Sequence, residues 1–263
     1  MTLRKLARTP SAVVRTAAAV FLLLGVAILP ASAQDGPRIA ASAKQSAEAL
    51  AAYIQEATSA RRRPDYSKPP VSDYLRNIID FETFAALPPP QAGDVSWLLA
   101  WNNSVNRAFK MMMYFGATSE SDMKQAMVLN LTENEDAIMR AMAFEVRLGS
   151  RMMQTMPLFM AALPPEDPKR TEIRKAGIKR AQRGLVETVQ GTSMSLTGPM
   201  QPQNALRLAE ALRDTAPVWA PLATASERAE LLKLFKKAAD ANVYPGVVNA
   251  LDKASATVSG VKD

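Results

Sequence analysis

The sequence predicts an all-α fold, a multi-helix bundle of about eight helices in the mature chain. Apolar residues recur at helical spacing through most of the sequence, and most persistently between Asn134 and Leu163. No stretch of the sequence keeps the apolar–polar alternation that is typical of half-buried strands. Prolines and glycines separate the helical stretches, as the short turns of a helix bundle require.

The segment from Asn134 to Leu163 is expected to form the central helix. A seven-residue frame places a continuous, mostly apolar row at its a and d positions, namely Met139, Met142, Val146, Gly149, Met153, Met156, Met160 and Leu163. The c positions are also largely apolar, so the apolar face covers more than half of the helix surface. Such a helix is usually buried on most sides. Pro157 is expected to kink or break it beyond its midpoint.

Residues 1–33 have the three-part pattern of a cleaved secretory signal peptide. Basic residues without an acid precede an apolar run from Ala17 to Leu29, and Ala31-Ser32-Ala33 forms a small-x-small cleavage site. The apolar run is shorter than the about 20 residues that a membrane-spanning helix needs, so we expect cleavage rather than anchoring. The mature protein is therefore expected to begin at Gln34 and to be periplasmic or secreted, without stable membrane insertion.

The mature chain is expected to form a single all-helical domain over residues 34–263. An N-terminal helix and a Pro/Arg-rich linker occupy 34–70, and the helical core occupies 71–263. Removing the four basic residues of the signal peptide leaves 28 basic and 25 acidic residues. The high overall isoelectric point therefore comes partly from the signal, and we expect no nucleic-acid partner. Because cysteine is absent, the fold must depend on its core rather than on disulfides.

Four helices are expected before the central one, at 39–59, 72–87, 94–116 and 119–131. The second is stopped by Pro88-Pro89-Pro90, because proline cannot continue a helix. The third carries Trp97 and Trp101 on its apolar row and is closed by Gly116. These tryptophans, beside several asparagines, are interpreted as core residues, and a sugar-binding platform is the alternative.

After the central helix, further helices are expected at 169–190, 204–214, 226–241 and 245–257. Residues 191–202 are rich in Gly, Ser, Thr and Pro and are expected to form a loop. The segment around Trp219 is bounded by prolines and is left unassigned.

A weak internal repeat relates positions sixty residues apart. Arg147-Leu148 corresponds to Arg207-Leu208, and Thr155-x-Pro157 corresponds to Thr215-x-Pro217. A genuine repeat would make the fold a duplicated helical hairpin, and not a solenoid, which needs at least about three copies. Chance similarity between Ala/Leu/Lys-rich helices is the alternative explanation, and the sequence leaves the two open.

The chain contains no histidine, which removes the commonest general base and the usual catalytic zinc ligands. No glycine-rich phosphate-binding loop is present. The one acidic residue on the apolar face of the central helix is Glu145. It is expected to be either a buried acid with a raised pKa or the partner of Arg107, Arg140 or Arg151. A carboxylate-dependent enzyme using Glu145 is therefore one alternative function.

Eleven of the thirteen methionines other than Met1 lie between Met111 and Met160. In the first interpretation they fill an irregular core, since methionine is flexible and polarisable. In the second they line a groove for an apolar ligand or partner, with candidate residues Met139, Met142, Glu145, Met153, Met156 and Met160. In the third, thioethers of Met152, Met153, Met156 and Met160 bind Cu(I), which would make the protein a periplasmic Cu(I) handler.

The helix expected at 169–190 has a strongly basic arc formed by Lys169, Arg170, Arg174, Lys175, Lys179, Arg180 and Arg183. This arc is interpreted as a solvated face, with weak contact to an anionic surface as the alternative. The function predicted from the sequence is that of an exported, non-catalytic helical envelope protein that binds a partner protein or a small apolar ligand. We assign it no cofactor and no metal site.

Overall fold

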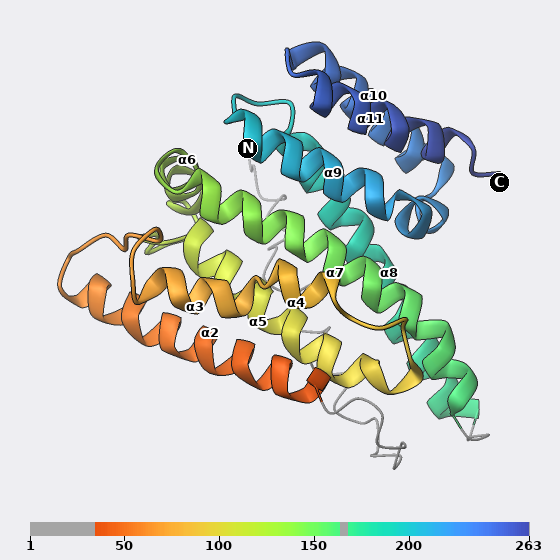
Figure 1. The fold of residues 1–263 in the computed structure, drawn as a ribbon, viewed down its shortest axis with the longest axis horizontal. Coiled ribbons are helices and arrows are strands. Elements are labelled where there is room, and N and C mark those ends of the chain that lie inside the picture. Colours follow the sequence, from red (N-terminus) through yellow and green to blue (C-terminus); the bar gives the residue numbers. More distant parts are fainter. Residues whose placement is uncertain (1–34, 164–167, 263) are drawn as a thin grey trace, which may run out of the picture.

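The computed structural model describes residues 35–163 and 168–262, so the predicted signal peptide lies outside the described residues. Within these ranges the chain consists of helices, turns and loops, without a strand. The predicted all-α, multi-helix fold is confirmed. Figure 1 shows the helices arranged as a bundle, with the long helices lying side by side across the molecule.

The helices of the first half are α2 (Asp35–Ser59), α3 (Val71–Ile78), α4 (Phe81–Ala85), the 3-10 turn η2 (Ala92–Asp94), α5 (Val95–Met113) and α6 (Met123–Glu133). The second half contains α7 (Glu135–Ala162), α8 (Pro168–Ser195), α9 (Pro202–Trp219), η3 (Ala220–Leu222), α10 (Ala225–Ala241) and α11 (Pro245–Ser259).

One layer of the bundle follows the order α2, α5, α7, α9, α11, each helix packing against the next. Helix α8 covers α7 and α9 from behind, and α10 lies against α8 and α11. As the sequence predicts, α7 is central, since it packs against α5 on one side, α9 on the other and α8 behind.

An aromatic cluster joins the N-terminal helices to α7. Phe144 packs edge-on against Phe81 and Phe84 with ring centroids 5.0 and 5.5 Å away, and Trp101 lies 5.2 Å from Phe144. The Trp101 indole donates a 2.8 Å hydrogen bond to the Ile78 carbonyl oxygen, which satisfies its only polar group inside the core. Both Trp97 and Trp101 are buried, so they do not form an exposed platform in this structure.

Three predicted helix boundaries were wrong. The helix expected at 72–87 is interrupted after Ile78, because the Asp80 carboxylate accepts the Thr83 N–H at 2.9 Å and starts α4. The loop expected at 191–202 is helical as far as Ser195. The helix expected to end at Asp214 continues through Pro217 to Trp219. The central helix α7 is not broken at Pro157 and continues to Ala162.

The two segments of the sequence repeat adopt comparable local structures. Each is a long helix containing a Thr-x-Pro sequence, followed by a second helix that returns across the bundle. The Thr155 hydroxyl donates to the Arg151 carbonyl oxygen at 2.9 Å, and the Thr215 hydroxyl donates to the Ala211 carbonyl oxygen at 2.6 Å. The correspondence of sixty residues therefore extends to these side-chain hydrogen bonds.

Candidate functional site

The methionine row of α7 lies inside the molecule. Met139, Met142, Met153 and Met156 are buried and belong to the main hydrophobic core, and Met160 is half-buried. Met152 is buried as well. The neighbouring helices enclose these side chains, so the row does not line an open groove in this structure. A ligand could reach it only after these helices had moved apart.

Glu145 is half-buried between α7 and α5. Burial raises the pKa of its carboxyl group from 4.5 to about 7, against the opposing effects of a hydrogen bond from Asn106 and the positive charge of Lys110. Burial also lowers the pKa of Lys110, and the charge of Glu145 partly offsets this effect. None of Arg107, Arg140 and Arg151 is among the groups that shift the pKa of Glu145, and Arg151 donates to the carbonyl oxygen of Pro88.

Two polar side chains act on the carboxyl group of Glu145. The neighbours that affect its pKa are an amide and an ammonium group. Among the described residues, no three carboxylates, histidines or cysteines lie close enough together to hold a metal ion. With a pKa of about 7, the Glu145 carboxyl group can take up or release a proton near neutral pH.

A different region of the molecule exposes apolar side chains to solvent. Eight large hydrophobic residues are exposed among those described, and seven of them lie on α6, at the ends of α5 and α8, or in the turn between α10 and α11. We call these seven residues the apolar end, and they are Tyr114, Met123, Val128, Leu129, Met194, Val243 and Tyr244. The eighth, Leu158, lies near the opposite end of α7.

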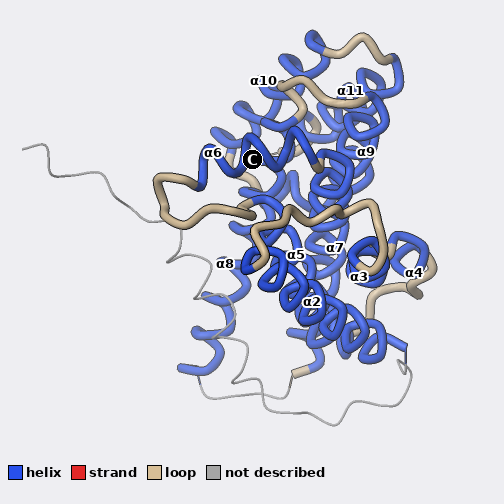
Figure 2. The backbone as a smooth tube through the Cα atoms, turned by 90° about the vertical axis from the view of Figure 1, so that its left-hand side faces the viewer, coloured by secondary structure: helices blue, strands red, loops and turns tan. Residues whose placement is uncertain are grey.

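Polar contacts fix α6 and the starts of α7 and α9 at this end of the bundle. The Asn130 side-chain amide donates to the carbonyl oxygens of Met113 and Phe115 at 3.1 and 2.9 Å, which ties α6 to the end of α5. The Gln201 N–H donates to the Glu135 carboxylate at 2.7 Å, which joins the starts of α9 and α7. Figure 2 looks toward this side of the bundle, where α6 projects from its neighbours.

Helix α6 has an unusual distribution of polar and apolar residues. Asn130 is 0% exposed, whereas Val128 and Leu129 are 57% and 43% exposed. Arg63, from the loop between α2 and α3, donates to the Asn130 side-chain oxygen at 3.0 Å and pairs with Glu133 at 2.7 Å. Because α6 is held by polar contacts and buries few apolar residues, much of its apolar surface is exposed to solvent and accessible to another molecule.

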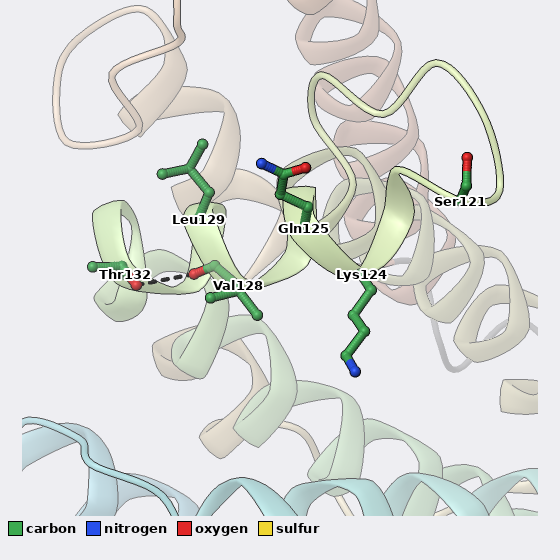
Figure 3. Close-up of a pocket in the computed structure, with 6 residues that line it drawn as sticks. All are labelled: Ser121, Lys124, Gln125, Val128, Leu129 and Thr132. Atoms are coloured by element: carbon green, nitrogen blue, oxygen red, sulfur yellow. Dashed lines mark hydrogen bonds between the residues drawn. The ribbon is translucent and has the colours of Figure 1, made fainter.

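The outer face of α6 carries two rows of side chains with a spacing of four residues (Figure 3). One row contains Ser121, Gln125 and Leu129, and the other contains Lys124, Val128 and Thr132; together they line a shallow depression. Rows with this spacing form the ridges and grooves by which one helix packs against another.

Most side chains of the basic arc of α8 that are described face solvent, whereas Arg174 is half-buried. Lys175, Lys179, Arg180 and Arg183 are exposed. Lys175 pairs with Glu172 at 2.9 Å, and Arg183 pairs with Glu187 at 3.0 Å and also with Glu227. The side chains of Lys169 and Arg170 lie outside the described residues. The arc is thus partly neutralised by nearby carboxylates, and contact with an anionic surface stays a prediction.

No protein-family model, curated protein sequence or solved structure shows a significant match to this chain. Within the described ranges, no helix combines the length and the apolar character needed to cross a membrane. The sequence analysis singled out the methionines of α7, but it did not identify the apolar end. The helical period could not have revealed it, because the residues that α6 buries are Ala126 and the polar Asn130 and not its apolar row.

Proposed function

We propose that this protein is an exported, non-catalytic helical protein of the cell envelope that binds a partner protein through its apolar end. The observation that carries the proposal is the gathering of seven of the eight exposed large hydrophobic residues at one end of the bundle. Isolated exposed hydrophobic residues are normal on protein surfaces, whereas a gathering of them marks an interaction site.

The residue types support a protein partner rather than a small ligand. Four of the seven residues are tyrosine or methionine, both of which are enriched in protein–protein interfaces. Val243 is 84% exposed in the turn between α10 and α11. A small apolar ligand needs a concave pocket that covers most of its surface, whereas residues on helix ends and turns suit a larger partner.

Export is supported by the signal-peptide pattern of residues 1–33. Cleavage after Ala33 would remove none of the described residues. It would also keep Gly36, on which the Trp97 ring packs so closely that an added Cβ would come within 2.4 Å of the ring.

The proposal is tested by site-specific photo-crosslinking in the native envelope. A photoreactive residue at Val243 is expected to give an adduct of one defined mass with a second protein. The same residue at Leu158 is the matched control, because Leu158 is also an exposed hydrophobic residue but lies away from the apolar end. Equal labelling from both positions, or no adduct from Val243, would contradict the proposal.

A further inference from the structure

Buried donor groups without an acceptor are concentrated on one turn of α7. Among the described residues, four buried side-chain nitrogen or oxygen atoms have no hydrogen-bond partner, and three of them are Arg147 Nε, Ser150 Oγ and Arg151 Nε. The fourth is the hydroxyl oxygen of Tyr66, in the loop between α2 and α3. Folded proteins leave few buried polar groups unpaired, so each one calls for an explanation, and a bound ion is one such explanation.

The three side chains share one face of α7. Arg147 and Arg151 are four residues apart and are therefore neighbours on the helix surface. With Ser150 they span an arc of about 100° around the helix axis. Gln154 falls within the same arc and is exposed, and 25% of the Arg147 side chain is exposed, whereas Ser150 is only 2% exposed. The face thus reaches solvent beside a buried hydroxyl group.

Each guanidinium group uses only part of one binding edge. The Nε and Nη2 atoms form an edge that binds a carboxylate or a phosphate through two parallel hydrogen bonds. Arg147 donates from Nη2 to Asp214 Oδ2 at 2.8 Å, and its Nε is unbonded. Arg151 donates from Nη2 to the Pro88 carbonyl oxygen, and its Nε is also unbonded.

The nearby carboxylates are already engaged. Arg213 donates to the second oxygen of Asp214 at 2.7 Å. Asp94 accepts from the Gln91 N–H at 2.8 Å and from the Trp97 indole at 3.0 Å. Burial lowers the pKa of the Arg151 guanidinium, and the charge of Asp94 opposes this effect. Burial therefore disfavours the cation at this position, and a bound anion would stabilise it.

The donors suit a tetrahedral oxyanion better than a planar carboxylate. A carboxylate pairs with a single guanidinium edge, so it would leave the donors of the other side chains without an acceptor. Here the donors belong to three side chains spread around the helix, and a phosphate group presents acceptor oxygens in several directions. Arg147 and Arg151 are half-buried, so their long side chains can turn to admit the anion without movement of the helices.

We propose that this turn of α7 binds a phosphate group, as free phosphate or as a phosphate monoester, through Arg147, Ser150 and Arg151. The anion accepts hydrogen bonds from the Nε–H groups of both arginines and from the hydroxyl group of Ser150. The site contains no residue of the apolar end, so it goes beyond the proposed partner binding and does not depend on it.

Calorimetric titration of the purified mature chain with inorganic phosphate, at constant ionic strength in a chloride buffer, tests the proposal. Saturable binding of one phosphate per chain is expected, and acetate is expected not to compete. Glycerol 1-phosphate distinguishes the two sources of the group. Tighter binding than that of inorganic phosphate assigns the site to a monoester, and weaker or equal binding assigns it to the free anion.

Two variants separate the site from general attraction by charge. Arg151→Lys keeps the positive charge but loses the guanidinium edge, and it is expected to bind phosphate roughly tenfold more weakly. Ser150→Ala removes one donor and is also expected to lower the affinity roughly tenfold. Arg180→Lys on α8 changes an exposed arginine in the same way, so it is the matched control and is expected to bind like the wild type.

Ser150→Ala also keeps the test decisive if Arg151→Lys loosens the contact with Pro88. Because the hydroxyl of Ser150 has no partner in the free protein, its removal should leave the thermal midpoint without phosphate unchanged or higher. A lower midpoint would show that the hydroxyl has an internal partner and would overturn the proposal. Absence of saturable phosphate binding, or equal affinity of the wild type and both site variants, would overturn it as well.

Discussion

Helices α6 and α7 follow one another in the chain, and both are rich in methionine and leucine, yet they use these residues in opposite ways. In α7, Met139, Met153 and Met156 are buried in the core. In α6, Met123 is 42% exposed and the buried residues are Ala126 and Asn130. Composition alone therefore does not separate a core helix from an interaction helix; the direction in which the apolar side chains point does.

The difference arises from what each helix packs against. Helix α7 has helices on several sides. Burial of its wide apolar face against them stabilises the folded state, because apolar surface is removed from water. Helix α6 meets the rest of the molecule mainly where α5 ends, and the groups available there are backbone carbonyl oxygens. A side-chain amide satisfies these carbonyls and an apolar residue cannot, which explains why Asn130 points inward.

The largest expected effect distinguishes the buried methionines from the exposed residues of α6. Met156→Ala should lower the free energy of unfolding by about 2–5 kcal/mol, because it creates a cavity in the core. Val128→Ala should change it by less than about 0.5 kcal/mol, since surface substitutions seldom do more. Urea melts of both variants measure the two values. An equal loss of unfolding free energy in the two variants, whether large or small, would remove the distinction between the helices.

Removal of the inward amide of α6 should have the next largest effect. Asn130→Ala leaves the carbonyl oxygens of Met113 and Phe115 without their donor and should cost about 1–3 kcal/mol. The loss should appear as faster hydrogen exchange in α6 than in α7. Asn130→Asp is a useful comparison, because it keeps an acceptor for Arg63 but lacks the amide donor. Unchanged exchange in α6 would mean that Asn130 does not hold the helix in place.

Glu145 is the inward-facing charged group of α7 and gives a pH-dependent prediction. Its pKa is raised from 4.5 to about 7 in the folded protein, so the folded state holds its proton more tightly than the unfolded state. Stability should therefore fall as pH rises from about 4.5 to 7 and then level off. Glu145→Gln removes this loss and should stabilise the protein by about 1–3 kcal/mol at pH 8, with a much smaller effect at pH 4.5. Thermal melts at the two pH values measure the difference.

A destabilising effect of Glu145→Gln at pH 8 would contradict this interpretation. It would show that the carboxylate is held in its charged form by Lys110, as in a structural ion pair, rather than penalised by burial.

The smallest expected effect concerns copper. Anaerobic Cu(I), measured in competition with a chelator, should bind the wild-type chain no more tightly than a variant with Leu at Met152, Met153, Met156 and Met160. Exchange of Met for Leu nearly conserves volume and usually costs under about 1.5 kcal/mol per site, so the fold should survive. A tight stoichiometric site that the Leu variant lacks would favour the Cu(I) function over partner binding.

The sequence predicted α7 better than α6 for a physical reason. The apolar residues of α7 recur with one period over more than three heptads, and that signal leads to a central helix whatever surrounds it. The same rule applied to α6 selects Met123, Met127 and Leu131 as the packing face, but Met123 is exposed and the other two are only half-buried. The orientation of α6 depends on tertiary contacts that no local pattern contains.

The candidate site shows the same limit. Glu145 could be identified because its charged side chain interrupts an apolar row. The sequence predicted either a buried acid with a raised pKa or a partner of an arginine, and the pKa that burial raises agrees with the first. Its neighbours Asn106 and Lys110 could not be chosen in advance, since the rotation of α5 against α7 decides which side chains face it. The residues of the apolar end come from four segments between Tyr114 and Tyr244, and only the fold places these segments at the same end of the bundle.

Methionine oxidation, followed residue by residue with mass spectrometry, tests the central claim most directly. Peroxide converts exposed methionines to sulfoxides faster than buried ones. In the purified chain at low concentration, Met123 and Met194 should oxidise first, and Met139, Met153 and Met156 last. In the native envelope, Met123 and Met194 should become protected when the apolar end is covered. Fast oxidation of the three α7 methionines, or no protection of Met123 and Met194 in the envelope, would contradict the account.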